Sequence, residues 1–388
     1  MNLRAEVSAL TESLVAVRRD FHQHPEIAFE EVRTSAIIAD HLEALGLEVE
    51  RHVGKTGVVA KLRGAKPGKT VLIRADIDAL PFSEQTGAAY ASQTPGAMHA
   101  CGHDGHASIA MHVARIFAKH QSELHGNFLF VFQPAEEIVS GAKAMLADRP
   151  NLLEGVDRVV GLHLWNDKPV GWVGARVGAS FASADAFSIF IQGKGGHAAV
   201  PHQTVDPVVV GAQLILALQT VVSRNTDPQN SSVVSVCTII AGEGAHNIIP
   251  DNIELRCTLR TFDPELRLVL QKRIEALCTH TAEAFGASAR LEWKTGVPPL
   301  VNDAASTERF KELALGVVSS VETHNPTMGG DDVAEFLARV PGVYFLVGSG
   351  AGYPHHHPKF DIDDTASLPL ATELLAKVAL EFAGNAVD

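Results

Sequence analysis

Cysteine is scarce in this chain of 388 residues, which contains only Cys101, Cys237, Cys257 and Cys278. Four cysteines in so long a chain do not form a disulfide framework, so the fold must depend on a hydrophobic core. Cys237 and Cys257 lie in apolar, strand-like runs and Cys278 lies in a helical pattern, and we expect all three to be buried. Cys101 differs, because polar residues and glycine surround it.

Positive charge is also in short supply. The chain has 32 Lys and Arg residues against 45 Asp and Glu residues, a formal net charge of -13 at pH 7. This balance argues against nucleic acid, and against an anionic membrane surface, as the main partner.

Long hydrophobic runs are missing as well. The N-terminus carries no apolar segment of the kind found in signal peptides. The longest apolar run, residues 208–222, is interrupted by Gln213 and Gln219 and is short for a membrane span, which predicts a buried helix. We therefore expect a soluble, cytoplasmic protein without a membrane partner.

No nucleotide-binding fingerprint is visible. The nearest glycine runs, G-K-G-G at 193–196 and G-S-G-A-G at 348–352, do not give G-x-G-x-x-G at the start of a helix. This disfavours a zinc oxidoreductase, which would need a nicotinamide cofactor.

The chain does contain two patterns of secondary structure. Up to about residue 178, apolar strand-like runs alternate with amphipathic helical segments, which is typical of a largely parallel sheet with helices on both faces. The order then becomes β-α-β-β-α-β, the ferredoxin-like order, before the first pattern returns. We predict an α/β fold with a mainly parallel sheet, built from residues 1–180 and 296–388, and an inserted α+β domain of residues 181–295.

The stretch from Met98 to His106, M-H-A-C-G-H-D-G-H, concentrates metal-binding side chains. Cys101 and His103 stand two positions apart, which suits a loop that turns both toward one ion. Thiolate and imidazole are typical ligands of zinc and its neighbours in the first transition row. The simpler interpretation is a polar turn before a helix, because the chain has 19 histidines.

Further ligand types follow other predicted strands, at the edge where open α/β sheets place their chemistry. One such residue alone is usually a satisfied polar group. Their joint occurrence at several strand ends indicates a functional metal centre. The set comprises Asp76, Asp78, Cys101, His103, His106, Glu136, Glu137, His163 and His355 to His357.

The adjacent Glu136 and Glu137 indicate a division of roles. At a turn both side chains can face a site, one as a metal ligand and the other as a general base on water whose pKa the metal lowers. The residues themselves leave open which glutamate does which.

The chain resembles the M20 metallopeptidase family, in its branch of aminoacylases, hippurate hydrolases and IAA-amino acid hydrolases. The resemblance covers nearly the whole chain in family order, and implies a zinc-peptidase-like catalytic domain with the inserted domain as lid and dimerisation domain. The motifs that carry it are R-R-D-F-H-Q-H-P-E, R-A-D-I-D-A-L-P, M-H-A-C-G-H-D-G-H, Q-P-A-E-E, G-L-H, G-K-G-G-H-A-A-V-P-H, H-N-I-I-P-D and H-H-P-K-F-D.

The resemblance also implies two divalent metal ions, for which Zn²⁺, Mn²⁺, Co²⁺ and Ni²⁺ are all suitable. Cys101 would bridge the ions, Glu136 would be the general base, and Asp76 would orient the site. His197 and Asn247 would hold the substrate's carboxylate or the oxyanion, with that histidine reaching the partner subunit's site in a homodimer or higher homo-oligomer. The remaining metal ligands would be His103, Glu137, His163 and His356.

The activity implied is hydrolysis of the amide bond of N-acyl amino acids, such as N-acetyl or N-benzoyl amino acids, to a carboxylic acid and a free amino acid. Alternatives are a small dipeptidase or an N-acetyl-diaminopimelate-type deacetylase on the same site, or a binding homologue without catalysis. One departure concerns the acyl pocket, where the family usually has Glu-Asp and then an aromatic residue. This chain has Asp331, Asp332 and Val333 there, which leaves substrate preference open.

Overall fold

The computed structural model describes residues 1–350 and 352–387, which divide into two compact units. The first unit comprises Met1–Gly178, Val301–Asn325 and the residues from Asp332 onward. The second comprises Ala179–Leu300 and Pro326–Asp331. The grouping of residues 326–331 with the second unit is a feature that the sequence pattern does not indicate.

The first unit is built on a seven-stranded sheet with the order β1-β2-β4-β3-β5-β15-β6. The central pairs β4–β3, β3–β5 and β5–β15 are parallel, and the outer pairs are antiparallel. The strands are β1 (Glu48–Val53), β2 (Gly57–Arg63), β3 (Lys66–Asp76), β4 (His125–Gln133), β5 (Arg158–Trp165), β6 (Val173–Gly174) and β15 (Gly342–Gly348).

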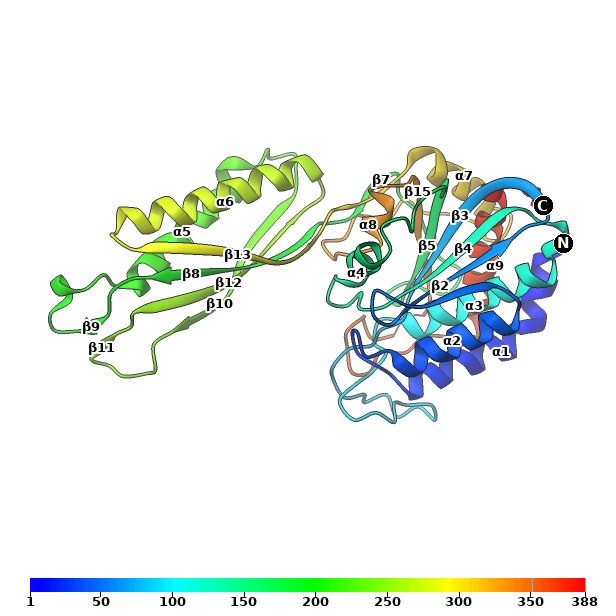
Figure 1. Ribbon diagram of the computed structural model, residues 1–388, viewed down its shortest axis with the longest axis horizontal. Coiled ribbons are helices and arrows are strands. Elements are labelled where there is room, and N and C mark those ends of the chain that lie inside the picture. The colour runs from blue at the N-terminus through cyan, green and yellow to red at the C-terminus, as the bar shows by residue number, and fades with distance from the viewer. Residues whose placement is uncertain (351, 388) are drawn as a thin grey trace. The chain divides into compact units, whose positions relative to one another are not determined.

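Helices cover this sheet because its central strands are apolar on both faces; every residue of β15 is buried. In Figure 1, α1, α2, α3 and α9 gather on one face and α4 with α8 lies on the other. The helices of this unit are α1 (Leu3–Gln23), α2 (Val32–Ala44), α3 (His103–Lys119), η1 (Gln121–Glu123), α4 (Gly141–Asp148), α7 (Ala304–Ala314), α8 (Ala334–Leu337) and α9 (Asp364–Ala383).

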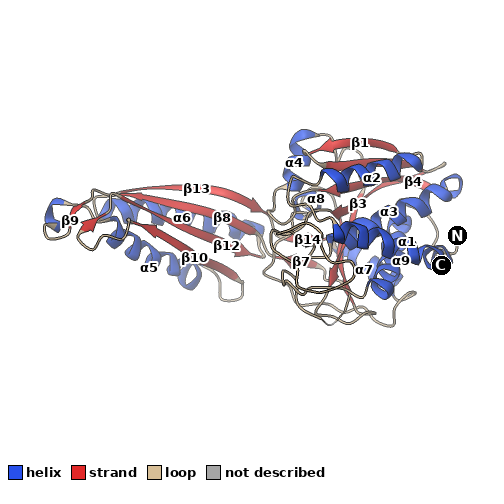
Figure 2. Ribbon diagram, turned by 90° about the horizontal axis from the view of Figure 1, so that it is seen from below, coloured by secondary structure: helices blue, strands red, loops and turns tan. Residues whose placement is uncertain are grey.

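The second unit is a four-stranded antiparallel sheet, β10-β12-β8-β13, with two long helices (Figure 2). Its strands and long helices follow one another along the chain in the order β-α-β-β-α-β. It has a core of its own, in which Ile189, Leu214, Leu255 and Ile274 are completely buried. Its elements are β8 (Ala184–Gln192), β9 (Gly196–His197), η2 (Pro201–Gln203), α5 (Pro207–Asn225), β10 (Ser232–Ala241), β11 (Ile248–Ile249), β12 (Asn252–Thr261), α6 (Pro264–Ala284) and β13 (Ser288–Val297). The short strands β7 (Gly178–Phe181) and β14 (Leu300–Asn302) lie where the chain passes between the units.

The predicted fold class, α/β with a mainly parallel sheet, is confirmed. The predicted burial of Cys257 and Cys278 is confirmed too, but Cys237 is exposed. It lies on the edge strand β10, where the pairing register shifts between Val236 and Thr238, and this irregularity breaks the inward-outward alternation of the strand.

The expectation of a buried helix near residue 208 is wrong in part. Helix α5 buries Val210 and Leu214, but Val209 is 49% exposed and Leu216 is 64% exposed. By length and composition alone α5 is apolar enough to cross a bilayer. About a third of its most apolar 18-residue stretch is buried inside the structure. The amphipathic packing on the sheet accounts for its inner face.

Candidate metal centre

The predicted ligands of the first unit come from the carboxyl ends of neighbouring strands. Asp76 ends β3, the two glutamates follow β4, and His163 lies near the end of β5. His103 is the first residue of α3, and His356 lies in the loop between β15 and α9. Since the carboxyl ends of parallel strands meet at one edge of the sheet, the fold brings these residues together.

Two histidines are oriented by main-chain carbonyls. His103 donates from Nδ1 to the Asp78 carbonyl at 2.9 Å, and His163 donates from Nδ1 to the Leu164 carbonyl at 2.7 Å. Because Nδ1 of each ring is used in this bond, Nε2 is the nitrogen that remains to bind a metal ion. Metal-binding histidines are typically held by such a bond on the other ring nitrogen.

The ligand atoms form two groups that share one sulfur. Cys101, His103 and His163 bring one ligand atom each within 4.8 Å of one another, and so do Cys101, Glu137 and His356. The Cys101 sulfur lies 3.5 Å from His163 Nε2, and Glu137 Oε2 lies 3.3 Å from His356 Nε2. These two groups could each hold a divalent ion, with Cys101 common to both.

A turn with unusual backbone angles presents both glutamates to the same place. Ala135 and Val139 have φ angles of 53° and 47°, in the left-handed region. Glu136 and Glu137 consequently each place a carboxylate oxygen 3.9 Å from His103 Nε2. Adjacent residues of a regular strand could not both do so.

Burial makes the anionic ligands costly in the absence of a cation. It raises the pKa of the Cys101 thiol well above its usual range and raises the pKa of Glu137 to about 7. Burial also lowers the pKa of His163 well below its usual value, which keeps the ring neutral. Neutral imidazole is the form that binds metal.

The donor set fits divalent metal ions. His103 Nε2 and Glu137 Oε1 are buried and have no hydrogen-bond partner in the described part of the chain. These two atoms lie 3.9 Å apart, and leaving both buried is unfavourable unless a cation or water satisfies them. Thiolate, imidazole and carboxylate together suit first-row transition metals.

Asp76 and His106 lie next to His103 and form a hydrogen bond with each other. His106 donates from Nδ1 to Asp76 Oδ1 at 2.6 Å and accepts from the Leu164 N–H at Nε2, 2.9 Å away. Both nitrogens of His106 are thus in use. Burial opposes ionisation of Asp76, but Arg74 and the nearby histidines hold its pKa well below the usual range. Asp76 therefore places a negative charge 3.7 Å from His103 Nε2.

The three consecutive histidines face different ways. His356 has a φ of 60° and donates its N–H to the Ala100 carbonyl at 2.8 Å, which holds the strained residue beside the Cys101 loop. His355 Nε2 donates to the Leu164 carbonyl at 2.9 Å, and His357 stacks on Tyr353.

The sequence places Asp78 among the candidate ligands, but in the structure its carboxylate binds main-chain N–H groups. Its two carboxylate oxygens accept the main-chain N–H groups of Glu136 and Glu137, each at 3.0 Å. The carboxylate therefore fixes the turn that carries both glutamates. In the sequence, Asp78 is recognisable only because it follows Asp76 by two positions at a strand end. That spacing cannot distinguish a metal ligand from a residue that binds main-chain N–H groups.

His197 and Asn247 lie in the second unit, where both are exposed. The strands β9 and β11 pair His197 with Ile248, and the Asn247 carbonyl accepts the Ala198 N–H at 3.0 Å. The fold thus brings these two predicted substrate-binding residues side by side, in a unit separate from the predicted ligands.

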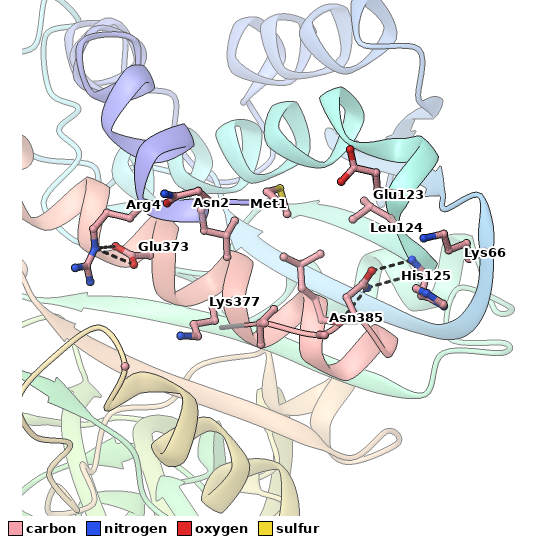
Figure 3. Close-up of a pocket in the computed structure, with 15 residues that line it drawn as sticks. Met1, Asn2, Arg4, Lys66, Glu123, Leu124, His125, Glu373, Lys377 and Asn385 are labelled. Atoms are coloured by element: carbon pink, nitrogen blue, oxygen red, sulfur yellow. Dashed lines mark hydrogen bonds and ion pairs between the residues drawn. The ribbon is translucent and has the colours of Figure 1, made fainter.

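A groove of about 830 Å³ lies at the opposite edge of the sheet, between the start of α1 and the end of α9 (Figure 3). Arg4, Lys66, His125 and Lys377 are among the residues that line it. None of the predicted site residues of the described chain lines this groove. Its charges are mixed and it carries no part of the centre.

The sequence matches the model of Peptidase family M20/M25/M40 over residues 72–381. An N-acetyl-L-cysteine deacetylase of Bacillus subtilis (strain 168) is 40% identical over 360 residues, which covers 93% of this chain and 86% of that protein. An N-acyl-L-amino acid amidohydrolase of Geobacillus stearothermophilus is 41% identical over 297 residues, covering 76% of this chain and 80% of that protein.

Among solved structures, the Bacillus subtilis YXEP protein, described as a dinuclear metal binding peptidase from the M20 family, is 34% identical. It matches with a TM-score of 0.83 and covers 96% of this chain and 98% of that chain. These findings confirm the family that the motifs resemble: this protein is a hydrolase that belongs to Peptidase family M20/M25/M40.

Proposed function

We propose that this protein hydrolyses the amide bond of N-acyl amino acids, with two divalent metal ions held around Cys101. The observation that carries the proposal is the pair of ligand groups that share the Cys101 sulfur, with Glu136 beside them. The relatives named for N-acetyl-L-cysteine and N-acyl-L-amino acids support the same class of substrate.

Each residue has a defined task in this proposal. Cys101, His103 and His163 would hold one ion, and Cys101, Glu137 and His356 would hold the other. Bound divalent ions supply a Lewis acid for the amide carbonyl and lower the pKa of a water molecule. The mixed sulfur, nitrogen and oxygen donors suit Zn²⁺, Mn²⁺, Co²⁺ and Ni²⁺, and the order of affinities alone does not select one of them.

Glu136 moves the proton. Its carboxylate accepts a proton from the attacking water and passes it to the amide nitrogen, which must be protonated to leave as an amine. Asp78 holds the Glu136 main chain in place and Asp76 keeps a negative charge beside His103. These fixed neighbours support a base that does not have to reorganise during the reaction.

His197 and Asn247 are proposed to bind the substrate's carboxylate or the oxyanion, with the second unit serving as lid and dimerisation domain. A homodimer is supported by the edge strand β10, which leaves Ile239 56% exposed and Ile240 45% exposed. We also propose a cytoplasmic location, which the four free cysteines support, because disulfide bonds are rare in that compartment.

Replacing Glu136 by glutamine tests the mechanism. Glutamine keeps the size of the side chain but cannot accept the proton, so turnover should fall by roughly a hundredfold to ten-thousandfold. Release of free amino acid would be measured over a panel of N-acetyl and N-benzoyl amino acids, with metal content determined on the same samples. Glu137→Gln is the matched variant, and it should lose metal where Glu136→Gln keeps it.

Near-normal turnover in Glu136→Gln would refute the proposed base. The same assay, extended to dipeptides and N-acetyl-diaminopimelate, separates the alternatives. Amine release from dipeptides alone would indicate a dipeptidase, and release from N-acetyl-diaminopimelate alone would indicate that deacetylase. Binding of N-acyl amino acids without amine release, in metal-loaded protein, would indicate a homologue without catalysis.

A further inference from the structure

Helix α1 carries a completely buried arginine, Arg18. A buried guanidinium needs anionic partners, and Arg18 has three. Its Nε donates to Asp104 Oδ2 at 2.8 Å, its Nη2 to Asp361 Oδ1 at 3.0 Å and its Nη1 to Asp364 Oδ2 at 3.3 Å. The planar fork of the guanidinium reaches in three directions at once.

These carboxylates belong to the two segments that carry proposed ligands. Asp104 directly follows His103 in the first turn of α3. Asp361 stands five residues after His356, in the loop that leads into α9. Arg18 therefore joins a segment of the first ligand group to a segment of the second. The bond from the His356 N–H to the Ala100 carbonyl is a further link between these parts of the chain.

Neighbouring side chains fix the ends of this connection. His22, one turn further along α1, places Nδ1 at 2.8 Å from Asp104 Oδ2. Tyr90 donates its hydroxyl to Asp361 Oδ2 at 2.7 Å. The carboxylates are thus held from two sides, which leaves the guanidinium little freedom to shift.

We propose that Arg18 is a positioning residue for the metal centre. One guanidinium sets the separation between the start of α3, with His103, and the loop that carries His356. This deepens the proposed function and rests on its assignment of those two histidines as ligands. It also gives a role to the R-R-D-F-H stretch of α1, which contributes no ligand to the centre.

Arg18→Lys tests the proposal, because an ammonium keeps the charge but cannot span three carboxylates in a fixed plane. Arg19→Lys is the matched control: Arg19 donates to Asp364 at 2.8 and 3.0 Å, and its side chain is 39% exposed. Affinity for Zn²⁺ and Co²⁺ would be measured by competition with a chromogenic chelator. Circular dichroism would verify the fold of each metal-free variant.

We expect Arg18→Lys to bind metal at least about tenfold more weakly and to change the visible spectrum of bound Co²⁺, which reports ligand geometry. Arg19→Lys should stay within about twofold of the original protein. A purely structural role would lower the melting temperature of Arg18→Lys but leave the Co²⁺ spectrum and the affinity of the folded protein unchanged, and that result would overturn the proposal.

Asp361→Asn provides a second variant if Arg18→Lys does not fold. It removes one carboxylate and leaves the pair of Arg18 with Asp104 intact, so the ion held by His356 should be weakened more than the other. If both ions bound to Asp361→Asn with the same affinities as to the original protein, the proposal would be overturned.

Metal binding is measured without substrate, so the two proposals can fail separately. Amine release by the original protein together with unchanged metal affinity in Arg18→Lys and Asp361→Asn would refute the positioning role alone. Two bound ions without amine release would refute the proposed function alone.

Discussion

At the residue scale, the two oxygens of Asp78 fix the turn that carries both glutamates. We predict that Asp78→Asn lowers kcat/KM or metal affinity by roughly tenfold to a hundredfold. An amide offers one acceptor oxygen in place of two, so one of the two buried N–H groups would face an NH₂ group and lose its partner. Kinetics with a fixed N-acetyl amino acid, together with chelator competition, would measure both effects.

Asp157→Asn is the control for this change. Asp157 also accepts a main-chain N–H, from Thr70 at 2.8 Å, but at an exposed position at the other end of the sheet. It should leave kinetics and metal affinity unchanged. If Asp78→Asn behaves in the same way as Asp157→Asn, the carboxylate has no positioning role.

The proximity of several candidate ligands could be predicted from the sequence, because their local spacing carries the signal. Cys101 and His103 stand two apart and the glutamates are adjacent, so the chain itself brings them together. Arg18 could not be predicted in this way, because its partners Asp104 and Asp361 lie 86 and 343 positions away. That contact is revealed only by the packing of α1 against α3 and against the loop between β15 and α9.

At the element scale, Asp332 joins two strands and a helix. Its carboxylate accepts Arg74 Nη2 of β3 at 3.2 Å and the main-chain N–H of Ala142, in the first turn of α4, at 2.9 Å. Gln133, the last residue of β4, donates to the same carboxylate. The aspartate that follows the Asp331 departure therefore connects secondary structures of the first unit.

We predict that Asp332→Ala lowers the free energy of unfolding by about 3–5 kcal/mol, because it leaves a buried arginine and two buried amide donors without this partner. Urea unfolding of metal-free protein would measure the effect. Asp303→Ala is the comparison, since Asp303 caps only α7, through the Ser306 N–H, and such caps contribute about 1 kcal/mol. Equal effects of the two substitutions would contradict the connecting role.

The elements themselves could be predicted well in type and less well in extent. Apolar runs and turn residues locate the central strands, because these strands are buried on both faces. Helix α3 begins at His103, directly after Gly102, whose φ of 94° turns the chain. Apolar periodicity starts later than the helical backbone, so the pattern missed the turn that holds His103.

At the scale of the whole molecule, each of the two units has a hydrophobic core of its own. One lies in the first unit, around residues such as Ile73, Phe130 and Leu374, and the other lies in the second unit. The sequence indicates this division because the order of helices and strands changes along the chain. It does not indicate that residues 326–331 group with the second unit, since that depends on contacts such as the bond from the Ala182 N–H to the Thr327 carbonyl.

Separate cores predict a local response to metal removal, because the proposed ligands all lie in the first unit. An ion present at a hundred times its dissociation constant stabilises the fold that binds it by about 2.7 kcal/mol. Chelation should therefore speed amide hydrogen exchange by up to about a hundredfold in α3 and β5, and leave β12 and α6 unchanged. Exchange followed by mass spectrometry would measure this, and added metal should reverse it. Cys101→Ala, which should lose both ions, is expected to show no response to the chelator. Equal changes in both units would contradict the location of the ions, and so would a full response in Cys101→Ala.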